Sequence, residues 1–104
     1  MAKYLYIYHG GGMPATQEEG ERMMAAWNTW YSEMGDAVVD PGNPVSQSHT
    51  VSASGSVAHG GANPVSGYTV VSATDIEAAK LMASGCPMVI DGSGSVEVAE
   101  IHEM

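Results

Sequence analysis

The sequence predicts an α+β protein in which two helices cover one face of an antiparallel sheet. An aromatic and apolar run near the N-terminus predicts a strand, and two later segments combine an N-terminal capping pattern with helical spacing. Polar runs with strand-like alternation lie between and after the helices. The chain has 104 residues, enough for one domain and too few for two. We therefore expect residues 1–104 to form a single domain.

The first predicted strand covers residues 3–9, along which tyrosines alternate with other side chains: Tyr4, Leu5, Tyr6, Ile7, Tyr8 and His9. Successive side chains of a strand point to opposite faces of the sheet. Both faces carry large side chains, so we expect both to be covered. The aliphatic face suits helix packing. The tyrosine face suits a wetter cavity or an interface, because each buried hydroxyl needs a hydrogen-bond partner.

The first helix is predicted over residues 17–34. Thr16 and Glu19 have the spacing of a capping box, in which each side chain can pair with the other residue's amide. Gly35 is a natural helix terminator. Large apolar side chains recur at helical spacing and form one broad face: Met23, Met24, Trp27, Trp30, Tyr31 and Met34.

The middle of the chain predicts a series of strands. Asp36–Asp40 reads as a short strand, and residues 48–53 and 57–59 read as a hairpin. The hairpin is polar and rich in serine, so we expect it at a sheet edge or across a solvated cavity. Residues 67–73 predict a further strand that is partly apolar on both faces.

The last third of the chain predicts a second helix over about residues 75–85, with Thr74 as its cap and Glu77 in the capping-box position. Cys86-Pro87 reads as a turn, and residues 95–102 as the final strand. This order matches a ferredoxin-like plan with an inserted hairpin. Helices would cover only one face of such a sheet, so we expect a homodimer that covers the other.

Charge and composition exclude several classes of partner. The net charge is −9, and the only cationic side chains are Lys3, Arg22 and Lys80. Three cations cannot neutralise a phosphate backbone, so we expect no nucleic-acid partner, and no anionic membrane for the same reason. Cys86 is the only cysteine, and no apolar stretch approaches the ~20 residues of a membrane span. We expect a soluble, cytoplasmic protein.

Short motifs spread along the chain resemble those of one family. They are Lys3-Tyr4-Leu5 with Tyr8, Gly67-Tyr68, Asp75 with Glu77-Ala78-Ala79, Cys86-Pro87 and Gly94-Ser95-Val96-Glu97-Val98. In order and spacing they resemble the YCII-related group, specifically its DGPF-type branch, and the resemblance runs essentially end to end. The Asp-Gly-Pro-Phe motif that names the branch is missing, and residues 59–68 occupy the corresponding stretch without any Phe.

The resemblance implies a ferredoxin-like fold that pairs sheet to sheet as a dimeric α+β barrel. It implies no particular reaction. Some relatives have been proposed as enzymes because a histidine and an aspartate meet in a cleft. More distant relatives of the fold include muconolactone isomerase and cofactor-free monooxygenases, and fold similarity alone transfers no function.

His9 is the best candidate for chemistry, because histidine is the usual acid–base residue near neutral pH and His9 ends the first strand beside the Gly10–Gly12 run. Asp36 or Asp40 would orient it, although Asp40 before Pro41 is equally suited to forming a turn. The candidate ligand-binding side chains are Tyr6, Tyr8, His49 and Tyr68.

No motif indicates a metal or a cofactor. Metal-ligand spacings of histidine or cysteine are absent, the glycine run lacks the pattern of a phosphate loop, and no serine lies in a nucleophile elbow. Three hypotheses follow. The first is a dimeric module that binds a small organic ligand in a cleft lined by tyrosine and histidine. The second is a cofactor-free lyase- or isomerase-like enzyme, and the third is a purely structural dimer.

Overall fold

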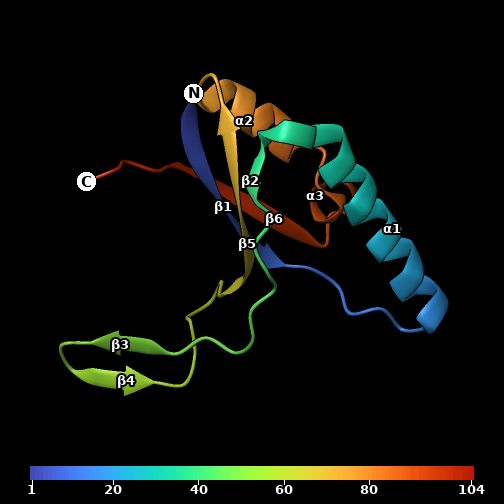
Figure 1. The fold of residues 1–104 in the computed structure, drawn as a ribbon. Coiled ribbons are helices and arrows are strands. Elements are labelled where there is room, and N and C mark those ends of the chain that lie inside the picture. Colours follow the sequence, from blue (N-terminus) through green and yellow to red (C-terminus); the bar gives the residue numbers. More distant parts are fainter.

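The computed structural model describes residues 1–104 as an α+β fold with a four-stranded antiparallel sheet and three α-helices (Figure 1). The strand order of this sheet is β2-β5-β1-β6, and β3 and β4 form a separate two-stranded sheet. The arrangement is compatible with the predicted ferredoxin-like plan. The elements are β1 (Ala2–Gly10), α1 (Gln17–Met34), β2 (Val38–Asp40), β3 (Thr50–Ser52), β4 (Gly55–Val57), β5 (Val65–Ala73), α2 (Ile76–Ala83), α3 (Pro87–Asp91) and β6 (Gly94–Glu100).

The tyrosine face of β1 is the face that packs under the helices, so the predicted orientation of this strand was wrong. The tyrosines lie in one core cluster with side chains of β5, α2, α1 and α3 and with Cys86, the residue before α3: Tyr4, Tyr6, Tyr8, Val71, Ala73, Ala79, Ala83, Trp30, Met88 and Cys86. Leu5, Ile7 and His9 lie on the opposite face and are only half-buried.

The tyrosines can be buried because their hydroxyls find partners inside the core. Tyr6 donates to the carbonyl oxygen of Ala79, and Tyr8 donates to Thr69 Oγ1 at 2.7 Å. Ala79 and Ala83 let α2 approach the rings closely, since neither side chain extends beyond Cβ. Burial raises the pKa of Tyr6 to about 12, so this hydroxyl remains a donor at neutral pH.

Helix α1 has the predicted bounds. Thr16 Oγ1 accepts from the amide of Glu19 at 3.1 Å, as expected for the cap. The Glu19 carboxylate accepts from the amide of Ala15 at 2.9 Å, one residue earlier than in a regular capping box. Trp30 is the only fully buried side chain of the helix. Helix α1 is the longest in the structure, and none of the helices is both long and apolar enough to cross a membrane.

The region from α2 to β6 differs from the prediction in two respects. Asp75, rather than Thr74, caps α2, because its carboxylate accepts from the amide of Ala78 at 2.8 Å. Helix α2 ends at Ala83, and Pro87 then begins the additional helix α3 instead of completing a turn. Proline suits the first position of a helix, where no amide donor is needed.

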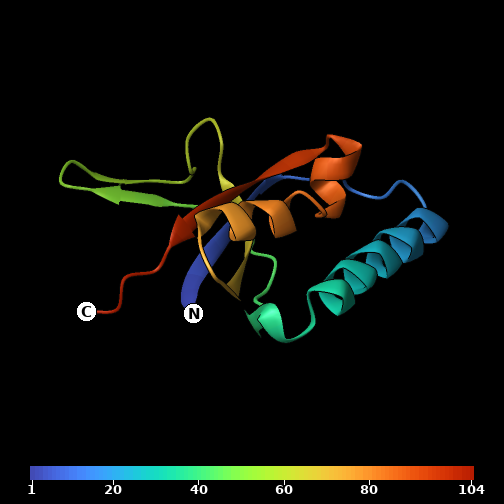
Figure 2. The ribbon, with the colours of Figure 1, turned by 90° about the horizontal axis from the view of Figure 1, so that it is seen from above.

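The β3–β4 hairpin projects from the rest of the molecule (Figures 1 and 2). The radius of gyration is 14.9 Å, whereas a compact domain of this length has about 13 Å. Only 12 of the 104 residues are buried. The core is therefore small for the length of the chain, and much of the surface of a single copy is left without a partner.

Candidate functional site

The sheet surface opposite the helices is the candidate site, and we call it the open face. It includes outward side chains of β1, β5 and β6, among them Leu5, Ile7, His9, Tyr68, Val70, Glu97 and Ala99. Leu5 is paired with Val70, and Ile7 with Tyr68, across the β1–β5 ladder. These four side chains form a continuous, half-buried apolar patch in the middle of the sheet.

A histidine–glutamate pair lies at one end of this patch. His9 Nε2 is 2.9 Å from Glu97 Oε1, and His9 Nδ1 is 3.2 Å from the carbonyl oxygen of Pro64. Both neighbours are hydrogen-bond acceptors, so both ring nitrogens must carry a proton for both contacts to form. The hydrogen bond to Glu97 raises the pKa of His9 more than burial of the ring lowers it. The side chain of His9 is 12% exposed and that of Glu97 is 61% exposed.

The strand register brings this pair together. In the β1–β6 ladder, Ile7 is opposite Glu97 and His9 is opposite Ser95, so Glu97 lies diagonally next to His9 on the same face. The two residues are 88 positions apart in the sequence. Sequence reasoning missed Glu97 because it assigned no neighbour to the final strand. Placing that strand antiparallel beside β1 is the step that would have identified it.

Neither predicted aspartate reaches His9. On β5, Val70 is the partner of Asp40 and Val65 is the partner of His9, which separates the two by about 16 Å along the sheet at ~3.3 Å per residue. Asp40 instead accepts from the amide of Gly42 at 2.9 Å, which is the turn-forming role considered for it. Asp36 lies in a short 3-10 helix, Gly35–Ala37, which precedes β2.

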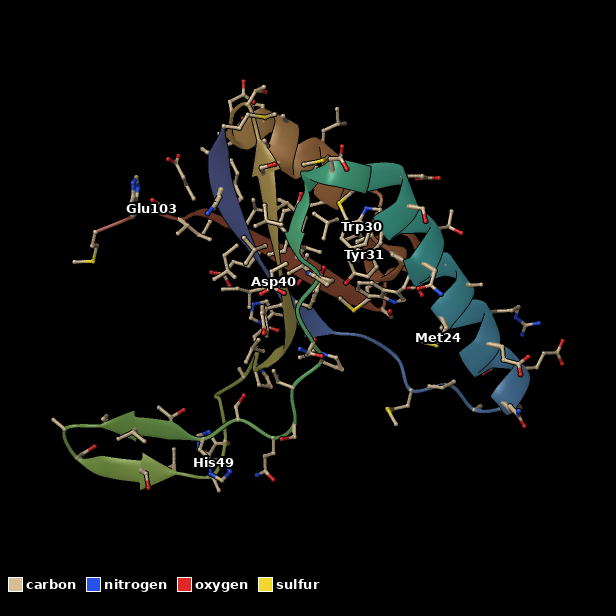
Figure 3. All side chains as sticks on the ribbon, viewed as in Figure 1. Met24, Trp30, Tyr31, Asp40, His49 and Glu103 are labelled. Carbon is tan, nitrogen blue, oxygen red and sulfur yellow. The ribbon has the colours of Figure 1, made fainter.

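The four predicted ligand-binding residues divide between three places. Tyr6 and Tyr8 are in the core beneath the helices, where their hydroxyls are already paired. His49 is exposed at the base of the β3–β4 hairpin, well away from Asp40 (Figure 3). Tyr68 is on the open face, on the strand next to His9. The structure therefore gathers His9 and Tyr68 on one surface and leaves the others elsewhere.

Two hollows of the surface lie outside the open face. A groove of about 640 Å³ separates α1 from α3, and residues such as Met23, Trp30 and Ile90 line it. It includes none of the predicted site residues. A smaller hollow of about 260 Å³ lies between the hairpin and the start of β5, with His59 and Pro64 among its lining residues. Because the carbonyl of Pro64 also contacts His9, this second hollow adjoins the histidine–glutamate pair.

Two other groups that could take part in catalysis or binding, the thiol of Cys86 and the amide of Gly11, are buried or already hydrogen-bonded. Cys86 is buried, and burial raises the pKa of its thiol. The amide of Gly11 donates to the carbonyl of Ser93 at 3.0 Å, which removes it as an anion-binding group. No cluster of three or more histidine, cysteine, aspartate or glutamate side chains is positioned to hold a metal ion.

The chain matches no protein-family model, and a search of curated proteins finds no match either. The YCII-related assignment therefore stays a prediction based on the motifs.

Proposed function

We propose that this protein is a homodimer that packs open face against open face and binds a small organic ligand beside His9 and Tyr68. The observation that carries the proposal is the apolar patch of Leu5, Ile7, Tyr68 and Val70, which no helix of the same chain covers and which ends at a charged pair. Burying this patch would lower the free energy in proportion to the apolar area removed from water.

The small core supports a second copy as the cover. A chain with so few buried residues gains most from association, and a two-fold dimer uses the same surface on both copies. The YCII-related resemblance points to the same sheet-to-sheet assembly. The helix side of the sheet is already occupied, so the open face is the surface left for it.

The ligand class follows from the side chains at this end of the sheet. The carboxylate of Glu97 offers an acceptor and the phenol of Tyr68 offers a donor, beside the aliphatic side chain of Ile7. The imidazolium of His9, whose two N–H groups are already paired, contributes positive charge and holds Glu97 in place. Pockets for small organic molecules combine an apolar lining with a few polar groups of this kind. We therefore favour a small, mainly apolar or aromatic molecule with one polar group.

Light scattering at micromolar concentration tests the dimer. We expect twice the monomer mass of 10.8 kDa for the native chain and the monomer mass for Ile7→Glu. Ile76→Glu is the matched control, because it makes the same change on α2, away from the open face. A native chain that is monomeric under these conditions contradicts the proposal.

Ligand-observed NMR with a library of small aromatic compounds tests the binding. We expect compounds that bind the native chain to be lost with Tyr68→Ala or His9→Gln. They should be retained with Ile90→Ser, which alters the separate groove between α1 and α3. Binding that is lost only with Ile90→Ser would place the ligand in that groove and overturn the proposed site.

A second candidate function is a cofactor-free lyase- or isomerase-like enzyme, in which His9 acts as a general acid and Glu97 takes the orienting part expected of Asp36 or Asp40. The two acceptors around the ring favour this candidate, because they hold the imidazole in its acid form. The rate should then fall as the pH rises through the raised pKa of His9. A rate that stays constant between about pH 5 and 8 would exclude a histidine acid.

A further inference from the structure

The projecting part of the chain, residues 45–64, has no core of its own, and we call it the arm. Strands β3 and β4 pair only with each other. Nineteen of the arm's residues are exposed, and only Ser48 is half-buried. The apolar side chains of Val51 and Val57 are 80% and 47% exposed. An isolated two-stranded hairpin is marginally stable at best in water, so the arm needs a further surface to hold it.

The arm is also free of full charges in a strongly acidic protein. Residues 41–74 contain no Asp, Glu, Lys or Arg, although the chain carries twelve carboxylates. Exposed segments normally carry charged side chains, whereas this one consists mainly of serine, glycine, alanine, valine and histidine. A neutral segment can lie against another acidic copy without like-charge repulsion.

The base of the arm is fixed to the sheet. The amide of Val45 donates to the carbonyl of Ser66 at 3.0 Å, and the amide of Tyr68 donates to that of Asn43 at 3.2 Å. Pro44 forms a bridge with Gly67 between these bonds. The sheet therefore sets the direction of the arm, and in Figures 1 and 2 the arm lies on the opposite side of the sheet from α1. That is the side on which a second copy would approach the open face.

We infer that the arm of each protomer lies on the surface of a second copy of this chain and clasps the dimer, with Val51, the more exposed of its two strand valines, as the apolar contact. The inference rests on the proposed face-to-face dimer and adds a second contact region to it. In a two-fold dimer the exchange is reciprocal, so each copy both extends an arm and receives one. The contact also supplies the apolar burial that the hairpin lacks within its own chain.

Analytical ultracentrifugation of three variants tests the clasp. Val51→Glu puts charge on the contacting face of the arm, and we expect the dimer dissociation constant to rise about tenfold or more. Leu81→Glu is the control, since Leu81 is also an exposed apolar residue, at 75%, but lies on α2. It should leave the constant near that of the native chain. If the arm variant dimerises like the native chain while Ile7→Glu is monomeric, the dimer stands and the clasp is wrong.

Amide hydrogen exchange gives an independent reading that does not depend on substitutions. We expect the amides of residues 50–57 to exchange slowly at concentrations where the native chain is dimeric and quickly on dilution to the monomer. Fast exchange of these amides in a demonstrated dimer overturns the clasp. A native chain that never dimerises overturns both the clasp and the proposed function.

Discussion

The hydroxyl of Tyr8 donates to Thr69 Oγ1 at 2.7 Å, and Thr69 in turn donates to the carbonyl of Pro41 at 2.9 Å. The hydroxyl of Tyr31 lies 3.2 Å from the same Thr69 oxygen. This network joins β1, β5, α1 and the turn after β2 at one point. Thr69 is fully buried, and its hydroxyl accepts the hydrogen bond of Tyr8 inside the core.

Thr69→Val should lower the free energy of unfolding by about 1–3 kcal/mol, because it preserves the volume of the side chain but removes the acceptor of the buried Tyr8 hydroxyl. Urea unfolding followed by tryptophan fluorescence measures the change. Ser72→Ala, on the other face of the same strand, should change stability by no more than about 0.5 kcal/mol. Adding Tyr8→Phe to Thr69→Val should recover part of the loss, and a double variant less stable than Thr69→Val would contradict this account.

The His9–Glu97 pair predicts a pH-dependent term in stability. The pKa of His9 is raised above its ordinary 6.5 in the folded chain. The pair therefore contributes in full below about pH 6.5 and loses its contribution as the pH rises through the folded-state pKa. Glu97→Gln should move the titration of His9 back toward 6.5 and cost about 0.5 kcal/mol near pH 6, because Glu97 is largely exposed.

NMR titration of the histidine ring signals measures this shift, with His9→Gln used to assign the His9 resonance. A titration of His9 that is the same in the native chain and in Glu97→Gln would show that Glu97 does not stabilise the imidazolium.

The N-terminal cap of α2 predicts different effects for substitutions of the neighbouring residues Thr74 and Asp75. Asp75→Ala should destabilise the chain by about 1 kcal/mol, since it removes the acceptor for the amide of Ala78. Thr74→Ala should have a much smaller effect, because Thr74 lies outside the helix. Thermal unfolding of the two variants measures the difference, and a larger loss with Thr74→Ala would restore Thr74 as the cap that the sequence pattern suggested.

Gly42 allows the turn after β2 to pass close to β5. Its φ is +69°, and a Cβ at this position would lie 1.7 Å from the carbonyl oxygen of Tyr68. Gly42→Ala should therefore destabilise the chain by about 3 kcal/mol, from backbone strain and overpacking together. Gly61→Ala separates the two effects, because its φ is +88° with no atom within 4 Å of the added Cβ. We expect it to cost about 1 kcal/mol in denaturant unfolding.

Local signals in the sequence were sufficient for the elements that depend on local contacts. The bounds of α1 follow from Thr16 and Glu19 at its start, from its apolar spacing and from Gly35 at its end. Helix α3 is not predicted by the sequence pattern, because Cys86-Pro87 is typical of a turn, although proline also suits the first turn of a helix.

The orientation of β1 depended on information that the pattern does not contain. Alternation separates Tyr4, Tyr6 and Tyr8 from Leu5 and Ile7, but it does not say which set faces the helices. The tyrosines can be buried only because Thr69 and the carbonyl of Ala79 accept their hydrogen bonds. Those partners are more than sixty residues away, so hydrophobicity alone favoured the aliphatic face.

The sequence predicts only one residue of the histidine–glutamate pair, because the pair depends on a contact between distant parts of the chain. The position of His9 at a strand end drew attention to it, and its glutamate partner depends on a strand pairing between the two ends of the chain. The predicted aspartates lie on or before β2, and β5 separates β2 from β1 in the sheet. They are therefore distant from His9 in space as well as in sequence.

The two free edges of the main sheet limit how this protein can aggregate. Strand β2 has only three residues and is followed closely by Pro41 and Pro44, and β6 carries the carboxylates of Glu97 and Glu100. Short strands, prolines and charges all discourage the addition of a strand from another molecule. Fibril-like growth along the sheet is therefore disfavoured at both ends, even though no helix of the chain covers the apolar patch of the open face.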